Sequence, residues 1–488
     1  MTEPGAVRGF KRSTKPLELL TDQQIEAIYQ GTLEVLEKTG VSMYHEQTLS
    51  FLDKQGCIVD FESKRVKIPQ SLAVDCLRKC PSSFTVKARD PKHSLRIDLD
   101  TLYFCNSIGM RLLDLSTWET RTPTVSDNIN AVRVLHSLDT VHFLGAYFPF
   151  MELDGVAPCM TLLEGMANMF RNSTKVMASA YQRDSEVFTI RMAKAAGTDL
   201  IGGVCASPPL TYDAAACEVV RRWTEAGFPL DIGSGAVMGG SAPVTIAGAT
   251  ITNNAELLAG IVLAQLLKPG VGVAVADFVH PLDMRRGTPV FGALECALHQ
   301  AVFNQFWRKH GVPTHSWYGF TNSKKIDFQS GYERSMAALV SAVSGASIID
   351  LHGAVYGELA WNPAQAVLDD DLAGWVGRFT EGVEVSEETL ATDLIKEIGP
   401  IPGSYLGTAH TRNWWKKSQF MPRSADRDTY PEWIKNGKKD ALNHACARME
   451  EILAGGESTL LTEDQDKALN QILEEARSYY RQKGLMNS

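Results

Sequence analysis

Short runs of apolar or small residues alternate with longer amphipathic segments from about residue 101 onwards. Eight of the short runs have the length of a buried strand, and each is followed by apolar residues at helical spacing. The predicted strands are 102–107, 141–148, 175–181, 201–207, 230–237, 271–278, 314–319 and 347–352. The predicted helices are 124–137, 157–170, 184–197, 213–226, 245–267, 291–310, 329–345 and 363–378. Eight strands, each followed by a helix, predict an α/β fold of the (β/α)8 TIM-barrel type.

The segments before and after this region have different patterns. Residues 1–100 predict a small α+β N-terminal module, in which a capping-box sequence from Thr21 to Gln24 begins a helix that ends at Gly40. Residues 101–384 form the predicted barrel. Residues 385–488 are charged and helical, and we expect this C-terminal extension to pack on the barrel, with Trp414 and Trp415 among its contacts.

Composition narrows the class of protein. The 488 residues are 44% hydrophobic and 22% charged, as in ordinary globular proteins. A net charge of −9 argues against nucleic-acid binding, and the absence of an apolar run of about 18 residues argues against a membrane span. The nine cysteines are scattered and show neither a disulfide framework nor a zinc-binding spacing. We therefore expect a cytoplasmic protein without a metal site of its own.

The candidate site lies at the carboxyl ends of the predicted strands, where TIM barrels bind their substrates. These ends carry many aromatic rings and few paired acids. Aromatic faces attract cations, and a quaternary ammonium suits them because it donates no hydrogen bond. The alternative is that the rings only fill space between strands and helices, and of the neighbours Trp317 and Tyr318 only one can point into the barrel. The predicted substrate-binding residues are Phe104, Asn106, Tyr147, Phe148, Trp317, Tyr318, His352 and Tyr356.

Two of these residues are polar anchors in this prediction, because Asn106 and His352 can hold a substrate carboxylate; a buried core histidine is the equal alternative for His352. The run from Asp350 to Gly353 begins like the corrinoid-binding pattern D-x-H-x-x-G, but Val355 takes the required glycine position. We therefore expect no corrinoid bound by this chain itself. A Schiff-base lysine at Lys324 is a further alternative, although its flanking residues are polar, and a catalytic lysine needs desolvation.

Several stretches, in order along the chain, resemble the trimethylamine methyltransferase family. They include LTDQQIEAIYQGTLEVLEKTGV, CPSSFTVKARDP, LLDLSTWETRTPT, SAPVTIAGATITNNAELLAGIVLAQL, DMRRGTPVFG, TNSKKIDFQSGYE and LGTAHTRNWW. The resemblance covers nearly the whole length. It implies a barrel enzyme that moves a methyl group from an amine to the Co(I) corrinoid of a separate small protein, which docks at the barrel mouth.

The archetypes of that family carry pyrrolysine, whereas this sequence has only the twenty standard residues. The chain thus resembles the glycine betaine methyltransferase branch, whose quaternary substrate is already activated. The resemblance implies methyl transfer from glycine betaine, releasing dimethylglycine, by positioning and without a catalytic acid, base or nucleophile. Other betaines (carnitine, proline betaine), a non-catalytic betaine-binding barrel and a lyase using Lys324 are the alternatives. We also expect a homo-oligomer.

Overall fold

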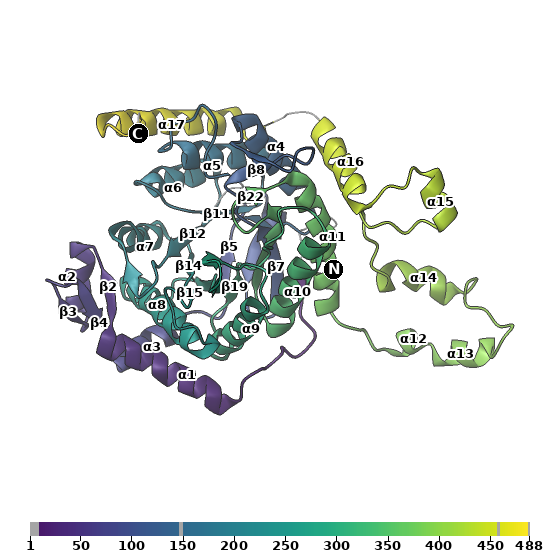
Figure 1. Ribbon diagram of the computed structural model, residues 1–488, viewed down its shortest axis with the longest axis horizontal. Helices are drawn as coiled ribbons and strands as arrows, with labels where there is room; N and C mark the ends of the chain where they lie inside the picture. Colours follow the sequence, from purple (N-terminus) through teal and green to yellow (C-terminus); the bar gives the residue numbers. More distant parts are fainter. Residues whose placement is uncertain (1–8, 146–149, 456–458, 487–488) are drawn as a thin grey trace.

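The computed structural model describes residues 9–145, 150–455 and 459–486. Eight parallel strands form a closed barrel, because the last strand pairs back with the first. They are β7 (Thr101–Asn106), β10 (Phe143–Leu144), β11 (Val176–Ser179), β12 (Leu200–Cys205), β14 (Leu230–Ser234), β16 (Val273–Asp277), β19 (Thr314–Ser316) and β20 (Ile348–His352). The predicted (β/α)8 barrel is confirmed, and every predicted strand overlaps one of these (Figure 1).

A helix follows each strand and packs outside the barrel. These helices are α4 (Val125–Ser137), α5 (Thr161–Asn172), α6 (Ser185–Ala196), α7 (Ala214–Ala226), α8 (Ile246–Leu267), α9 (Leu294–Lys309), α10 (Phe328–Ser344) and α11 (Pro363–Thr380). Helix α8 is the one helix in the described ranges with the length and apolarity of a membrane span. In its most apolar stretch of 18 residues, 72% is buried inside the protein. The helix is therefore only weak evidence for a membrane segment and has the burial of a core helix.

Side chains alternate between the two faces of each barrel strand. In β7, Tyr103 and Cys105 point into the barrel, whereas Leu102 and Phe104 pack against helices α10 and α11. The interior cluster also contains residues of β5 (Phe84–Val86) and β6 (Leu95–Ile97). This hairpin therefore closes the amino-terminal end of the barrel, and the space inside opens only toward the carboxyl ends of the strands.

The N-terminal segment covers one side of the barrel. Its elements are β1 (Phe10–Lys11), α1 (Asp22–Glu34), a π-turn (Val35–Thr39), β2 (Val41–Met43), α2 (Glu46–Lys54), β3 (Ile58–Asp60), β4 (Arg65–Lys67), α3 (Gln70–Lys79) and a 3-10 turn (Pro91–His93). Thr21 caps α1 with the expected capping box. Helices α1 and α3 lie against α8, and β13 (Thr211–Tyr212) pairs with β2 at the edge of this segment's sheet. The boundary at residue 100 stays a prediction.

Several short strands lie around the barrel mouth. One sheet combines β8 (Arg111–Leu113), β9 (Thr120–Arg121), β21 (Ala354–Val355) and β22 (Ala360–Trp361), and another combines β15 (Val237–Met238), β17 (His280–Asp283) and β18 (Thr288–Pro289). These strands belong to loops that follow the barrel strands. They build up the rim of the mouth and bring loop residues over the open end of the barrel.

The C-terminal extension has two parts. Helices α16 (Ala441–Ala454) and α17 (Glu463–Gln482) pack against the barrel helices α11 and α6. Before them come α12 (Glu387–Leu390), α13 (Thr392–Ile398), α14 (Ala409–Ser418) and α15 (Tyr430–Lys435), which project from the body (Figure 1). None of these four helices has a buried residue. The packing expected for the whole extension is therefore not seen here: Trp414 bonds Glu388 of the same projection, 2.9 Å away, and not the barrel.

A buried arginine connects the last two strands of the barrel to their helices. Arg334 of α10 is 1% exposed and pairs with Asp369 of α11 at 2.5 Å. The same guanidinium donates hydrogen bonds to the backbone oxygens of Gly319, Leu351 and Ala354. It thus fixes the loops that leave β19 and β20, on the side of the barrel that carries the site described below.

Replacing this arginine should destabilise the protein strongly. Arg334→Met leaves the buried Asp369 carboxylate and three carbonyl groups without their partner, which costs roughly 3 to 5 kcal/mol. The expected result is a clearly lower melting temperature by calorimetry. The control is Arg78→Met, which breaks an exposed pair with Asp75 at 3.8 Å and should change stability by roughly 0.5 kcal/mol or less. Equal effects of the two substitutions would contradict the assignment.

Candidate active site

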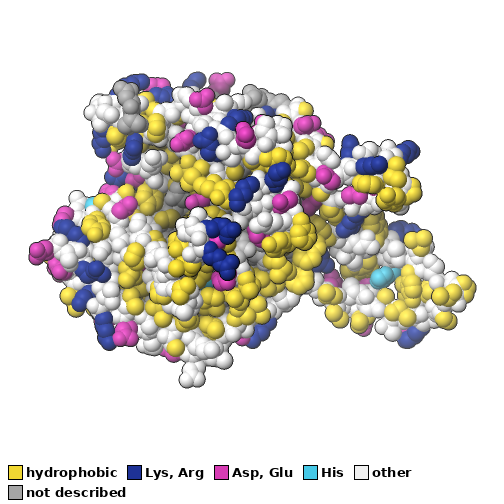
Figure 2. Space-filling view, in the orientation of Figure 1, with side chains coloured by type: hydrophobic (Ala, Val, Ile, Leu, Met, Phe, Trp, Pro, Cys, Tyr) yellow, Lys and Arg dark blue, Asp and Glu magenta, His cyan; other side chains and the backbone are white. Residues whose placement is uncertain are grey.

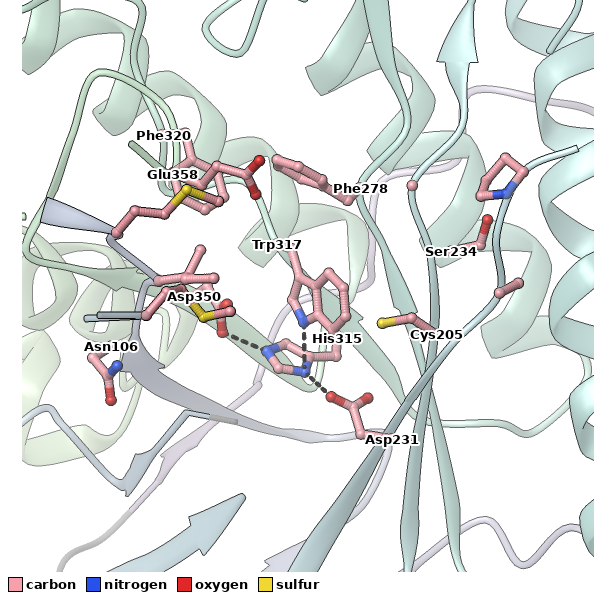
Figure 3. A pocket seen from close by; sticks show the side chains of 16 residues that line it. Asn106, Cys205, Asp231, Ser234, Phe278, His315, Trp317, Phe320, Asp350 and Glu358 are labelled. Atoms are coloured by element: carbon pink, nitrogen blue, oxygen red, sulfur yellow. Dashed lines mark hydrogen bonds and ion pairs between the residues drawn. The ribbon is translucent and has the colours of Figure 1, made fainter. Parts of the chain in front are cut away.

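A cavity of about 340 Å³ opens at the carboxyl ends of the barrel strands (Figure 3). Its volume suits a small organic molecule. The walls are mainly apolar, and the charged side chains among the described lining residues are three carboxylates and one histidine. Its lining includes Asn106, Asp231, Ser234, Phe278, His315, Trp317, Phe320, Asp350 and Glu358.

The floor of the cavity is a histidine held between two aspartates. His315 of β19 lies with Nδ1 2.8 Å from Asp231 Oδ2 of β14 and Nε2 2.6 Å from Asp350 Oδ1 of β20 (Figure 3). The histidine and Asp231 are each 4% exposed in their side chains, and Asp350 is 13% exposed. All three residues occupy inward-facing strand positions, so the closed barrel brings them together although they are far apart in the chain.

This arrangement keeps the histidine charged. Burial by itself lowers the pKa of His315, but the charges and hydrogen bonds of Asp231 and Asp350 outweigh burial and raise the pKa to about 10. Two carboxylates around one imidazolium leave a net charge of −1, fixed at the bottom of a largely apolar cavity. A cation entering the cavity is therefore attracted, and an anion is repelled.

Cys105 completes a group of three residues with metal-ligating atoms. Its Sγ lies 2.6 Å from Asp350 Oδ1, and the ligand atoms of Cys105, His315 and Asp350 lie within 4.8 Å of one another. These atoms already bond each other through protons. Burial raises the pKa of the Cys105 thiol well above its ordinary value, and the charge of Asp350 raises it further. Because a metal would need the thiolate and a neutral imidazole, the group as arranged favours protons over a metal ion.

One wall of the cavity is an indole ring that lies against a glycine. Trp317 follows β19, and its Nε1 lies 3.1 Å from His315 Nδ1. A Cβ placed on Gly233 of β14 would come within 2.5 Å of Trp317 Cη2. The ring therefore requires glycine at position 233, which explains this residue of the sequence Gly233-Ser234-Gly235 without a phosphate-binding role. Gly319 has a similar function, since its Cβ would meet the Asp350 carbonyl oxygen.

Two phenyl rings and a third carboxylate form the upper part of the cavity. Phe278 and Phe320 stand edge to face, with ring centres 5.2 Å apart. Glu358 enters from the turn between β21 and β22, where Tyr356 and Gly357 have positive φ angles of 52° and 61°. Burial raises the pKa of Glu358. A molecule in the cavity would thus meet rings above and an acidic floor below.

Of the predicted binding residues, the structure brings Trp317 and Asn106 to the cavity. The Asn106 amide accepts a hydrogen bond from Gly145 N at 2.8 Å and donates one to Ser107 O at 3.2 Å, so most of its polar capacity is used inside the protein. Contact of Trp317 or Asn106 with a substrate stays a prediction. Tyr147 and Phe148 lie outside the described residues.

Three other predicted residues point away from the cavity, two because of strand alternation and the third because of a break in it. Phe104 faces the helices and contacts the ring of Phe10, 6.0 Å away between centres. Tyr318 turns opposite to Trp317 and bonds the backbone oxygen of Val279. His352 follows an irregularity in the register between β20 and β7, and it is fully buried outside the cavity.

Neither His352 nor Tyr356 is placed to hold a substrate here. The ring nitrogens of His352 lie 3.1 Å from Cys105 O and 2.9 Å from Thr140 Oγ1, and burial lowers its pKa to about 4. This is the core-histidine alternative. Tyr356 lies outside the cavity lining, under Lys324, whose Nζ is 4.2 Å from the ring centre. Lys324 is exposed, which removes the Schiff-base alternative.

The expectation of few acids at the mouth was wrong. Sequence reasoning considered strand ends and missed Asp231, His315 and Asp350, which lie within the strands. A signal was present, since a charged or titratable residue interrupts each of the runs LDIGS, THS and IIDLH, where buried parallel strands normally read as apolar. Glu358 carried no such signal, because it lies in a loop.

The charged histidine predicts a pH dependence of stability. Its pKa is about 10 in the folded protein and about 6.5 in the unfolded chain. Its stabilising contribution is therefore complete below about pH 6.5 and is lost as the pH rises toward 10. The melting temperature of the wild type should fall over this window relative to that of His315→Gln. His444→Gln, at a histidine outside the cavity, should follow the wild type; parallel curves for all three proteins would refute the buried imidazolium.

Comparison with known proteins identifies the family of this chain. The family model described as trimethylamine methyltransferase (MTTB) matches residues 2–478. A glycine betaine methyltransferase of Desulfitobacterium hafniense (strain Y51) is 29% identical over 448 residues, covering 89% of this chain and 92% of that protein. The trimethylamine methyltransferase MttB of Methanosarcina barkeri (strain Fusaro / DSM 804) is 27% identical over 495 residues, covering 99% and 100%.

A solved structure supports the fold. The monomethylamine methyltransferase MtmB of Methanosarcina barkeri superposes with a TM-score of 0.55 at 13% identity, covering 94% of this chain and 88% of that one. At this identity the likeness concerns the barrel architecture alone. The family match, by contrast, spans nearly the whole sequence, and the chain therefore belongs to the trimethylamine methyltransferase (MTTB) family of methyltransferases.

Proposed function

We propose that this protein transfers a methyl group from a quaternary amine to the Co(I) corrinoid of a separate protein. Glycine betaine is the first candidate, with dimethylglycine as the product, because a glycine betaine methyltransferase is among its relatives. The family is one of methyltransferases, and the choice of substrate and acceptor is what the proposal adds. Carnitine and proline betaine remain the alternative substrates.

The observation that carries the proposal is the cavity's combination of rings and negative charge. Trp317, Phe278 and Phe320 offer aromatic faces and edges, and the Asp231–His315–Asp350 group carries a net charge of −1. No lysine or arginine lines the cavity in the part of the chain that the structure describes. A permanent cation that donates no hydrogen bonds matches these walls, and each cation–π contact contributes about 1 to 2 kcal/mol when desolvated.

The transfer itself needs no acid or base from this chain. The Co(I) centre supplies an electron pair to the methyl carbon as the C–N bond breaks. The electron pair of that bond stays on nitrogen, which leaves as a neutral tertiary amine, so no proton has to move. The protein has to hold one methyl group toward the open mouth, and such positioning can lower a barrier by several kcal/mol.

The acids and rings act on binding more than on the chemical step. The positive charge on nitrogen disappears as the methyl group leaves, so attraction to the cavity weakens toward the transition state. Interactions that are strongest in the ground state lower KM without raising kcat. Substitutions in these walls should therefore raise KM more than they lower kcat.

A carboxylated betaine would have to rely on neutral donors for its carboxylate. The side-chain amide of Asn106 is such a donor among the described lining residues, whereas the indole N–H of Trp317 lies 3.1 Å from His315 Nδ1, over the acidic floor. The acidic floor repels the carboxylate, so we expect it to lie away from Asp231 and Asp350. Choline, which replaces the carboxylate with an alcohol, is therefore an informative member of the substrate panel.

The methyl acceptor would approach at the barrel mouth. Exposed apolar residues stand on the loops around it, namely Met151, Val244, Met284 and Leu359, with exposed fractions from 39% to 72%. Such a rim suits transient contact with a partner protein. The nine cysteines are all free thiols, in keeping with the predicted cytoplasmic location, which stays a prediction.

The experiment is a methyl-transfer assay with free cob(I)alamin as the acceptor probe and glycine betaine, carnitine, proline betaine and choline as donors. The spectral change from Co(I) to methyl-Co(III), together with release of the demethylated amine, is the expected result. Calorimetry with the same amines provides the second readout. Tight binding without transfer would favour a non-catalytic betaine-binding barrel, and neither binding nor transfer with any amine would overturn the proposal.

Substitutions at Gly233 and Trp317 should be coupled. Gly233→Ala pushes the indole out of position and should raise KM for the best amine about 10-fold or more, while Trp317→Phe should have a smaller effect. In the double variant the phenyl ring no longer reaches the new methyl group, so Gly233→Ala should then cost little. A double-mutant cycle measures this coupling. If the two effects were strictly additive, contact between the ring and residue 233 would be excluded as the cause of the higher KM of Gly233→Ala.

A further inference from the structure

The segment from residue 383 to residue 418, called the arm here, leaves the body without forming a core. None of its 36 residues is buried. Eight large apolar side chains along it are exposed by 39% to 95%: Val383, Val385, Leu390, Ile395, Ile401, Tyr405, Leu406 and Trp415. Monomeric proteins rarely expose apolar groups on this scale, so the arm has the character of an interface.

The arm nonetheless has defined local structure. Ser386 caps α12 and Thr408 caps α14 through side-chain hydrogen bonds. Helices of 4 to 10 residues are only marginally stable in water without tertiary packing. A segment that forms capped helices but buries nothing within its own chain requires another surface against which to pack.

The same chain also carries a partly exposed apolar face near the arm, bordered by Phe420 and Pro422. On helices α10 and α11, Met336, Trp375 and Phe379 are exposed by 57%, 49% and 52%. The Trp375 and Phe379 rings stack at 5.9 Å, and a groove of about 500 Å³ runs beside them. Figure 2 shows hydrophobic side chains gathered both on the arm and on the neighbouring flank of the body. We call these exposed residues of α10 and α11 the α10–α11 face.

We propose that the arm of one copy packs on the α10–α11 face of a second copy, and the reverse, in a two-fold symmetric dimer. The arm begins directly after α11, so a two-fold axis near this point places each arm over the other copy's face. Such an interface is self-complementary and closes without leaving an uncovered arm. Its size is adequate, since a stable interface takes roughly 20 to 30 residues a side and the arm has 36.

Charge balance and position favour a second copy over another partner. The arm carries five acidic and four basic residues, so it offers no charge that would select a strongly charged partner. It also leaves from the amino-terminal end of the barrel, because Ser13 N bonds Thr380 O next to the strand that pairs with the start of β7. The mouth therefore stays free for a substrate or a transient protein, and the permanent contact lies at the opposite end.

The test is the mass of the full-length protein in solution by analytical ultracentrifugation. The wild type should sediment at no less than twice the chain mass of 53.6 kDa at micromolar concentration. The double variant Ile401→Asp with Leu406→Asp, and separately Phe379→Asp, should shift the protein toward the monomer. Ile58→Asp, at a position 65% exposed in the N-terminal segment, is the matched control and should leave the mass unchanged.

Hydrogen exchange identifies the surface that the arm covers. Peptides from α10 and α11 should exchange faster in the arm variant than in the wild type, while the far-ultraviolet circular dichroism signal falls by no more than the loss of the short arm helices. A monomeric wild type, or an arm variant that keeps its mass, would overturn the dimer. Unchanged exchange in α10 and α11 of a variant that has become monomeric would overturn the pairing with this face. Neither readout uses activity, so the result is independent of the proposed reaction.

Discussion

A buried positive charge between two buried negative charges is the constraint on which the centre of this barrel depends. Asp231 and Asp350 face each other across the inside of a closed sheet, where two uncompensated carboxylates would repel strongly. His315 lies between them as an imidazolium, and its positive charge offsets their mutual repulsion. The same group keeps Cys105 protonated and provides the floor for Trp317. The shape and the charge of the cavity follow from this one interaction.

The cavity combines two ways of attracting a cation. We expected rings alone from the sequence, whereas the structure adds a fixed negative charge beneath them. The combination suits a methylated amine, because charge acts at longer range and rings select against ammonium groups that need hydrogen-bond partners. In our proposal, the nucleophile for methyl transfer is the corrinoid of a partner protein. In the same proposal, the barrel orients the methyl group toward the open mouth.

The two proposals assign different contacts to the two ends of the barrel. The β5–β6 hairpin closes the amino-terminal end, and the arm leaves the body on that side. The carboxyl end holds the cavity and a rim with scattered exposed apolar residues. A lasting contact at one end and a passing contact at the other can coexist, since neither covers the other's surface. Arg334 stabilises the loops that follow β19 and β20, next to the cavity wall.

The sequence by itself determined the barrel, because apolar runs and helical periodicity are local properties that each segment displays independently. It also placed Trp317 and Asn106 at strand ends. What it could not determine is which side chains meet. Whether Phe104 or Cys105 faces inward depends on the register of a closed sheet, and a register irregularity turns His352 outward. The Asp231–His315–Asp350 group joins three strands separated by up to 119 residues (350 minus 231), and only closure of the barrel brings these charges within hydrogen-bonding distance.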